Sequence, residues 1–534
     1  LEVNSGYYYG VGDAEVSNND VNPGEGWAWG NPSEWFYPTT TREFPFTVDS
    51  IDLSGASTAR VRARLFGTTG VDNTGFDHDA KFWMNDSLVG EVFFEARTEG
   101  RLETVIPAAL LSGSSRLRIT SINTPTVPNQ FYLDWFEIDY QGFLMAKNNL
   151  AVFASPGPTG SNPTQFTVAG FSNPQIEVYD LTTRRAIVGG NVTGDSTGEY
   201  VIQFKDTSST AKNYVVFAVG GQMPVSPLSR KVFTNIRVNT QGADYIIITH
   251  QTFLGQAQRL AAHRQTVNQV RTKVIDVQEI YDEFNYGIMN GTRLKDFLHY
   301  AYLNWPAPAP TYLLLLGDAS WDFHKYMSTS TQTNFVPGYG VPTGDNWFAC
   351  FNPDSNFIPS MLIGRIPARD SVQAQRSVDK AIAYDNYTLG DWNKKYMFVA
   401  GLGFNSEQTI NTYVTPPPLG GIPFREYKTT PAVIDGEHKK EMRDLVRDGL
   451  VFLNFLGHSG GRIWEVDIGD PNTLENTGGP FPFMVSVSCN VGAYAEPSNP
   501  LLAEDFMLAD NCGSVASWAS STEGWANAGV GFVN

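Results

Sequence analysis

The chain has 534 residues and a formal net charge of −18 at pH 7, with 17% charged residues, 13% aromatic residues, 50 glycines and 31 prolines. This length predicts about three domains rather than one core, and the glycine, proline and aromatic content favours β-rich modules over helical bundles. An acidic chain without a basic block argues against nucleic acid as a partner, and no apolar run is long enough to span a bilayer.

Residues 1–145 show the alternation of apolar and polar side chains that is typical of half-buried strands. The clearest examples are residues 59–65 and 115–119, and residues 131–138 form an aromatic-rich closing strand. Turn residues separate these runs, so we expect a β-sandwich or jelly roll. Aromatic residues near the start could form a carbohydrate platform, but packing in a core is the interpretation we favour; they are Trp27, Trp29, Trp35, Phe36 and Tyr37.

Residues 146–225 repeat the strand pattern on a smaller scale, which predicts a small second β domain with strands at 175–180 and 214–219. From residue 243 onward, short apolar runs alternate with longer amphipathic segments. This pattern predicts alternating strands and helices and a mostly parallel sheet. The elements are expected at residues 245–248, 254–266, 274–277, 293–303 and 312–316.

The α/β region divides into two parts, residues 226–390 and residues 391–534, at a break where a predicted helix gives way to a predicted strand. The helix is expected at residues 373–387 and the strand at residues 396–400. The first helix and a second one at residues 439–447 are amphipathic, so both are expected to cover sheet faces. We expect the first part to supply packing and the second part to carry the candidate catalytic residues.

A histidine and a cysteine each come just after a buried apolar strand in residues 391–534. His458 follows the strand 450–456, and Cys489 follows the strand 483–487. Parallel strands end at one edge of a sheet, where open sheets collect reactive groups. An imidazole can take the proton of a thiol, and the thiolate is the attacking species. The backbone N–H groups of Ser459 and Cys489 are candidates to bind the oxyanion of an acyl transfer.

A buried structural cysteine and an ordinary loop histidine are the alternative interpretation of this pair. Three cysteines, Cys350, Cys489 and Cys512, cannot all pair, so at least one thiol is expected outside a disulfide. The seven histidines lack the spacing of metal ligands. Acidic turns at residues 72–77 and 467–470 leave structural calcium open, although turn-forming Asp and Asn are more common than calcium ligands. No cofactor is expected to be required for catalysis.

Several motifs in the same order resemble those of the gingipain-type cysteine peptidases, whose catalytic domain is caspase-like. The resemblance covers residues 230–534 and rests first on Gly457-His458-Ser459, Trp464 and the strand that ends in Cys489. Residues 312–318, 363–367, 499–504 and 513–525 match further family motifs. The resemblance implies that Cys489 is the nucleophile, that His458 moves its proton, and that Trp464 and Trp525 contact substrate. Family members also carry structural calcium.

Three departures from the family pattern change what the resemblance implies. The family has an acidic residue just after the strand that corresponds to residues 396–400, but this chain has Gly401-Leu402-Gly403, and its nearest acid is Glu407. Ser459 replaces the second glycine of a Gly-His-Gly motif and keeps a backbone N–H. Residues 411–413 carry no carboxylate to bind a basic side chain, so strict Arg specificity is not expected.

Within the family, residues 274–287 and 318–322 look more like the PorU-type sortases of the type IX secretion system than like the digestive gingipains. That resemblance implies cleavage of C-terminal signal domains from secreted cargo, transfer of the acyl group to an anchor, and an outer-membrane barrel as partner. The alternatives are a secreted endopeptidase without transpeptidation and a catalytically silent surface protein on the same fold.

The expected location is outside the cytoplasm: at the cell surface, associated with the outer membrane, or secreted. No positively charged leader precedes an apolar stretch at the start of the sequence. We therefore expect a soluble chain whose export signal has been removed or lies outside it. Family members continue beyond the position that corresponds to Asn534, so the subdomain 391–534 is expected to be incomplete at its C-terminus.

Overall fold

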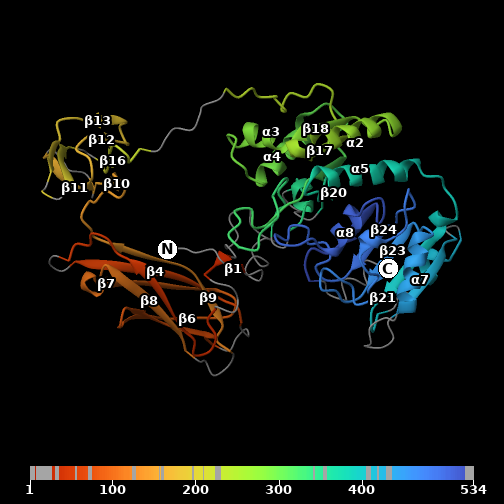
Figure 1. The fold of residues 1–534 in the computed structure, drawn as a ribbon, viewed down its shortest axis with the longest axis horizontal. Helices are drawn as coiled ribbons and strands as arrows, with labels where there is room; N and C mark the ends of the chain where they lie inside the picture. The colour runs from red at the N-terminus through yellow and green to blue at the C-terminus, as the bar shows by residue number, and fades with distance from the viewer. Residues whose placement is uncertain are drawn as a thin grey trace. The chain divides into compact units, whose positions relative to one another are not determined.

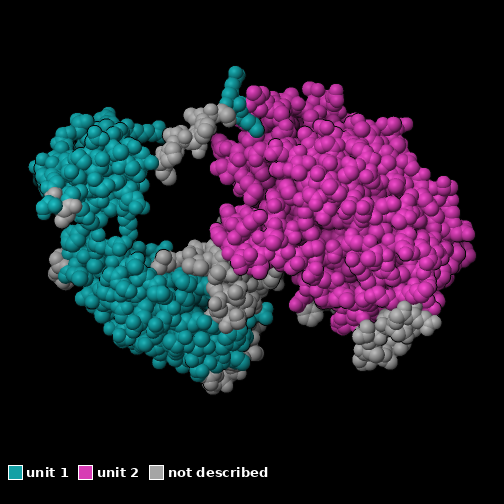
Figure 2. Space-filling view, viewed as in Figure 1, with its two compact units in different colours: residues 1–8, 27–231 teal, residues 9–26, 232–534 magenta. Residues whose placement is uncertain are grey.

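The computed structural model divides the chain into two compact units, coloured separately in Figure 2. Unit 1 comprises residues 1–8 and 27–231, and unit 2 comprises residues 9–26 and 232–534. The residues described are 6–7, 27–29, 35–53, 57–69, 75–122, 128–155, 157, 162–194, 196, 198–207, 210–222, 230–340, 343–352, 358–404, 410–417, 420–427 and 436–523. Among them, no helix combines the length and the apolar character needed to cross a membrane.

Two antiparallel sheets pack face to face in the first part of unit 1 (Figure 1). One sheet has the strand order β3-β8-β5-β6 and the other has the order β7-β4-β9. Alternate residues of both sheets share one core, which includes Val61, Leu65, Phe82 and Phe136. The predicted β-sandwich is confirmed. Its strands are β3 (Thr41–Thr47), β4 (Thr58–Gly67), β5 (His78–Met84), β6 (Ser87–Phe94), β7 (Glu99–Pro107), β8 (Ser114–Ser121) and β9 (Phe131–Tyr140), and a small separate pair is formed by β1 (Gly6–Tyr7) and β2 (Trp27–Ala28).

Aromatic residues near the start of the sandwich fill its interior. Trp35 and Phe36 are 7% and 1% exposed, and the Phe36 ring stacks on Phe131 with 4.7 Å between ring centroids. Trp29 meets the ring of Phe44 edge-on at 5.0 Å. Packing rather than a carbohydrate platform is therefore confirmed for these three residues, while the side chain of Trp27 lies outside the described part.

A second pair of antiparallel sheets follows in unit 1, with strand orders β10-β16-β12-β13 and β11-β15-β14. Their shared core contains Phe166, Phe171, Tyr214 and Val216. Strands occur close to where the alternation of the sequence predicts them. They are β10 (Leu150–Ala154), β11 (Thr164–Phe171), β12 (Ile176–Asp180), β13 (Arg185–Ile187), β14 (Asn191–Gly194), β15 (Tyr200–Asp206) and β16 (Asn213–Ala218).

Unit 2 begins with a four-stranded sheet of order β18-β17-β19-β20, in which every neighbouring pair is parallel. Helices α3 and α4 pack on one face, and helices α2 and α5 pack on the other. The elements are β17 (Tyr245–Thr249), α2 (Leu254–Val267), β18 (Thr272–Asp276), α3 (Val277–Phe284), α4 (Thr292–Asn304), β19 (Tyr312–Leu316), β20 (Leu362–Ile366) and α5 (Ser371–Asn386). Helix α3 was not predicted from the sequence; the Asp276 side chain caps it by accepting from the backbone N–H of Gln278 at 3.0 Å.

The second sheet of unit 2 has the order β22-β21-β23-β24-β25, again parallel throughout. Helices α7 and α8 cover one face through Met442, Val446 and Phe506, which pack with Leu453 and Phe455 of β23. The elements are β21 (Lys395–Ala400), β22 (Ile422–Tyr427), α7 (Gly436–Arg447), β23 (Phe452–Leu456), β24 (Phe483–Val487), α8 (Leu502–Leu508) and β25 (Ala516–Ala519). The prediction of a mostly parallel α/β region is confirmed.

Helix α5 joins the two sheets of unit 2. On one side Asp379 forms an ion pair with Arg259 of α2. On the other side the buried ammonium of Lys380 donates to the carbonyl oxygens of Phe506 at 3.2 Å and Cys512 at 2.9 Å. In Figure 1, α5 accordingly runs between the green first sheet and the blue second sheet. Helix α8, which covers the second sheet, is thus bonded to α5, and α5 is bonded to α2 of the first sheet.

Candidate active site

The strands β23 and β24 end side by side, and this places His458 and Cys489 at one edge of the sheet. They are parallel neighbours, and their register pairs Leu456 with Val487. His458 and Cys489 each stand two residues beyond this pair. The Gly457 N–H donates to the carbonyl oxygen of Val487 at 3.3 Å. The two loops therefore leave the sheet at the same level, because both strands end in register.

A direct hydrogen bond connects the two loops. The Ser459 hydroxyl donates to the carbonyl oxygen of Cys489 at 2.6 Å and accepts from the Gly461 N–H at 3.1 Å. The His458 side chain is exposed and Cys489 is half-buried. The His458 ring lies edge-on to Phe404, with 5.4 Å between ring centroids. A serine at position 459 thus gives a tether between the two loops that a glycine could not provide.

The segment from His458 to Glu465 folds back as a tight hairpin. The Glu465 N–H donates to the His458 carbonyl oxygen at 3.0 Å, and the Gly460 N–H donates to the Ile463 carbonyl oxygen at 3.2 Å. Ser459 lies opposite Trp464 between these two hydrogen bonds. The Ser459 N–H takes part in neither of them, because Ser459 and Trp464 form a non-hydrogen-bonded antiparallel pair. Gly461 has φ +78°, a left-handed conformation that glycine adopts without strain.

The loop after Cys489 is anchored on two sides. The Asn490 N–H donates to the Thr522 carbonyl oxygen at 2.8 Å, just beyond β25. Tyr494 donates its hydroxyl to Asp345 at 2.7 Å, and the Trp321 N–H donates to the Ala495 carbonyl oxygen at 3.1 Å. Asp345 and Trp321 belong to the first α/β part, so that part holds the loop that carries the thiol.

Trp464 lies in the core, which differs from the predicted substrate contact. It is 2% exposed, and its ring stacks on Phe455 at 4.6 Å with an interplanar angle of 12°. Its indole N–H donates to the Ser486 hydroxyl at 2.9 Å. A ring enclosed on this side of the sheet packs β23 against α8 and cannot reach a ligand outside. Trp525, the other predicted substrate contact, lies outside the described residues, as does Glu407.

Buried charges connect the two α/β parts close to this edge. Arg369 donates from Nε to Asp318 at 3.0 Å and also forms an ion pair with Glu504. The carboxyl side chains of Asp318 and Glu504 are 0% and 3% exposed. Burial raises the pKa of Asp318 to about 6 and raises the pKa of Glu504 well above its ordinary value. No pattern in the sequence signals that these three residues meet.

The three cysteines differ in their surroundings, and no disulfide links them. Cys350 and Cys512 are 1% and 3% exposed, and burial raises the pKa of both thiols. Cys489 is the more accessible thiol and lies two residues beyond β24, beside the His458 loop. This contrast favours Cys489 as the reactive one.

The acidic turn at residues 467–470 does not fit a calcium site. Asp467 forms an ion pair with Lys439 at 2.6 Å and accepts from the Gly469 N–H at 2.7 Å, while Asp470 accepts from the Asn472 N–H at 2.9 Å. The Lys439 ammonium group already supplies the positive charge that a calcium ion would bring to the Asp467 carboxylate. Throughout the described ranges, no three His, Cys, Asp or Glu side chains gather as metal ligands. Residues 72–74 of the other acidic turn are not described.

A profile of peptidase family C25 matches residues 238–534. The chain belongs to peptidase family C25. A C25 member is a cysteine peptidase that acts on protein substrates, and the match covers both parallel sheets and the His458 and Cys489 loops. No curated protein sequence matches the chain.

Two solved structures of peptidase-like proteins are among those similar to the chain. Dimeric latent PorU from Porphyromonas gingivalis has 17% sequence identity and a TM-score of 0.45, covering 80% of this chain and 40% of that chain. The Arg-specific cysteine proteinase gingipain R has 20% identity and a TM-score of 0.44, covering 54% of this chain and 65% of that one. The C25 chain thus spans well under half of the PorU chain that it matches.

Proposed function

We propose that Cys489 and His458 form the catalytic pair of this C25 peptidase. The register of β23 and β24, which brings both loops to one edge of the sheet, is the observation that carries this proposal. The Cys489 sulfur attacks the carbonyl carbon of a peptide bond, and His458 accepts the thiol proton. His458 then gives this proton to the leaving amine nitrogen as the C–N bond breaks, which leaves a thioester on Cys489.

The negative charge on the carbonyl oxygen needs hydrogen-bond donors during the attack. We assign this role to the backbone N–H groups of Ser459 and Cys489. Two observations support the assignment: the His458–Glu465 ladder does not use the Ser459 N–H, and the Ser459 hydroxyl fixes the distance between the loops through the Cys489 carbonyl. Two donors on tethered loops form a rigid cradle, which is what oxyanion stabilisation requires.

The fate of the thioester distinguishes a sortase from a protease. We propose transfer of the acyl group to an amine, as in the PorU-type sortases that residues 274–287 and 318–322 resemble. The substrates would then be secreted cargo proteins with C-terminal signal domains, and the enzyme would act at the cell surface beside an outer-membrane barrel partner. Hydrolysis of the thioester by water gives the alternative, a secreted endopeptidase.

Alkylation by iodoacetamide tests the catalytic pair without knowledge of substrate preference. At pH 6 an ordinary thiol is less than about 1% thiolate, so an activated thiol should react about tenfold faster or more. We expect Cys489 to be labelled first, with Cys350 and Cys512 as buried internal references in the same molecule. His458→Ala should remove this advantage, whereas His324→Ala, at an exposed histidine of unit 2, should not. Equal rates in wild type and His458→Ala would refute the pair.

Labelling by a peptidyl acyloxymethyl ketone then tests whether the thiol performs acyl chemistry. Labelling of the wild type that is lost in Cys489→Ala supports an enzyme. Equal labelling of the two proteins supports the alternative of a catalytically silent surface protein. Product mass spectrometry with a cargo signal-domain substrate separates the remaining two functions. A product that carries the mass of an added amine indicates transpeptidation, and a free carboxylate regardless of amine indicates an endopeptidase.

A further inference from the structure

The end of β21 lacks the acidic residue that would orient His458, yet a carboxylate from another element fills that place. Glu465, at the end of the hairpin that begins with His458, points its Oε1 atom at the His458 N–H and accepts a hydrogen bond of 2.8 Å. The Glu465 N–H donates to the His458 carbonyl oxygen at 3.0 Å. A single residue therefore holds both backbone polar groups of the histidine.

Two glycines leave the space that this carboxylate occupies. A Cβ atom built on Gly401 would lie 1.8 Å from Oε1 of Glu465, and one built on Gly457 would lie 2.8 Å from the same atom. Gly401 is the first residue after β21, and its N–H donates to the Leu456 carbonyl oxygen at 2.8 Å. A side chain at position 401 and the Glu465 carboxylate would compete for one volume. In this chain position 401 is a glycine, and the Glu465 carboxylate occupies the volume.

Neighbouring residues hold the backbone segments that carry Glu465 and face His458. Trp464, the preceding residue, is buried and bonded to Ser486, so the hairpin strand cannot rotate. Phe404 lies four residues past the end of β21, its N–H donates to the Gly401 carbonyl oxygen at 3.1 Å, and its ring contacts the His458 ring. The carboxylate and the imidazole thus both lie against the loop that follows β21.

We propose that Glu465 is the positioning carboxylate of His458, supplied from the hairpin after the histidine instead of from the end of β21. This inference rests on the proposed catalytic pair and adds a third residue to it. Glu465 holds the main chain of His458 so that the ring direction is fixed, and its negative charge stabilises the protonated imidazole. It contacts the histidine and not the substrate, so it is a positioning residue.

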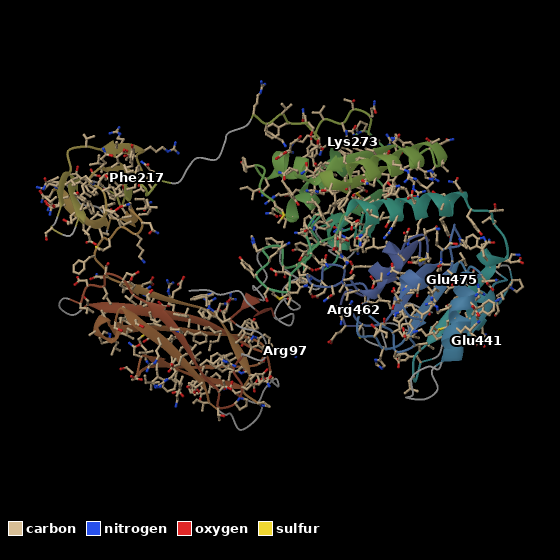
Figure 3. The ribbon with its side chains drawn as sticks, in the orientation of Figure 1. Arg97, Phe217, Lys273, Glu441, Arg462 and Glu475 are labelled. Carbon is tan, nitrogen blue, oxygen red and sulfur yellow. The ribbon has the colours of Figure 1, made fainter. Side chains whose placement is uncertain are left out.

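The substitution Glu465→Gln separates the charge from the hydrogen bond, because an amide oxygen can still accept from the His458 N–H. We expect the rate of Cys489-dependent turnover to fall by about tenfold to a hundredfold, because the amide keeps the hydrogen bond but removes the negative charge that stabilises the imidazolium formed during attack. The alkaline limb of the pH–rate profile should move to lower pH, because the imidazolium loses its nearby negative charge. Glu441→Gln, at an exposed acid on α7 that Figure 3 labels, is the matched control and should change neither quantity.

The competition for one volume gives a second test. Gly401→Asp alone places two carboxyl groups in one space and should lower the rate, whereas Gly401→Asp combined with Glu465→Ala should recover part of the rate lost in Glu465→Ala. Such non-additivity is expected only for residues that occupy one site. A double variant that is worse than either single variant contradicts the proposal.

An NMR titration of the His458 ring in the Cys489→Ala variant tests the role of Glu465 without requiring turnover. The ring pKa should be lower in Glu465→Gln than in Glu465-containing protein, with His458→Gln used to assign the signal. An unchanged ring pKa together with an unchanged pH–rate profile would overturn the role of Glu465. If the wild type shows no Cys489-dependent turnover, the proposed function fails, and the titration alone decides the positioning role.

Discussion

The buried charge cluster of Asp318, Arg369 and Glu504 allows a prediction of defined size. Arg369 reaches from the segment between β20 and α5 to Asp318 just beyond β19 and to Glu504 on α8. Burial raises the pKa of Asp318 to about 6, so this carboxyl group is mostly ionised at pH 7, and burial also raises the pKa of Glu504. The Arg369 guanidinium is the cation that both carboxyl groups contact. Removing the guanidinium leaves a buried carboxylate without its cation.

The substitution Arg369→Met should lower the free energy of unfolding by about 3–5 kcal/mol at pH 7, the usual cost of breaking a buried ion pair from one side. The folded variant must then bind a proton at Asp318 more tightly than the wild type does. Because the variant binds more protons than the wild type, its relative stability rises as pH falls. Because wild-type Asp318 is itself half protonated at its pKa of about 6, the loss should shrink by about 1 kcal/mol between pH 7 and pH 6.

Urea unfolding at pH 7 and pH 5, followed by tryptophan fluorescence, measures both the stability loss in Arg369→Met and its change with pH. Arg376→Met is the matched control, because Arg376 lies on α5 and pairs with Asp510 at 3.0 Å at the surface; its loss should cost less than about 1 kcal/mol. Adding Glu504→Gln or Asp318→Asn to Arg369→Met should restore part of the stability. A loss in Arg369→Met no larger than in the control, or one that grows as pH falls, would refute this account.

Substitutions at three further positions test the packing around the site. Trp464→Phe should cost about 1–2 kcal/mol through the lost indole hydrogen bond to Ser486, and Trp464→Ala about 3–5 kcal/mol, measured by urea unfolding. Burial lowers the pKa of Lys380 to about 7 from 10.5, so above pH 7 the unfolded chain binds more protons than the folded chain, and wild-type stability should rise by about 2 kcal/mol between pH 7 and 9. Lys380→Met should lack this rise, and the same slope in both proteins would contradict the lowered pKa of Lys380. Gly492→Ala places a Cβ atom 2.6 Å from the Ala519 carbonyl oxygen, so it should displace the thiol loop and slow Cys489 alkylation, while a wild-type rate would show that the loop adapts.

Much of the fold followed from the sequence, because burial leaves a local periodicity. The strands Tyr312–Leu316 and Phe483–Val487 are found within the bounds that their apolar runs predict, since a strand buried on both faces needs an uninterrupted apolar sequence. The alternation in residues 59–65 likewise predicted a strand with one buried face, β4. Helix α3 was missed because its first residue, Val277, was assigned to the strand predicted at residues 274–277, and periodicity over so short an apolar run does not separate strand from helix.

The sequence by itself determined the alternation of strands and helices, the two loops that carry His458 and Cys489, and the glycines where an acidic residue was expected. Tertiary structure alone decided that Trp464 turns inward, that Arg369 joins two parts of the chain, and that Glu465 occupies the space beside Gly401. Periodicity reports only whether a side chain is buried. The partner of a buried polar group depends on which distant segment supplies the matching donor or acceptor at hydrogen-bonding distance, and only packing in three dimensions fixes that.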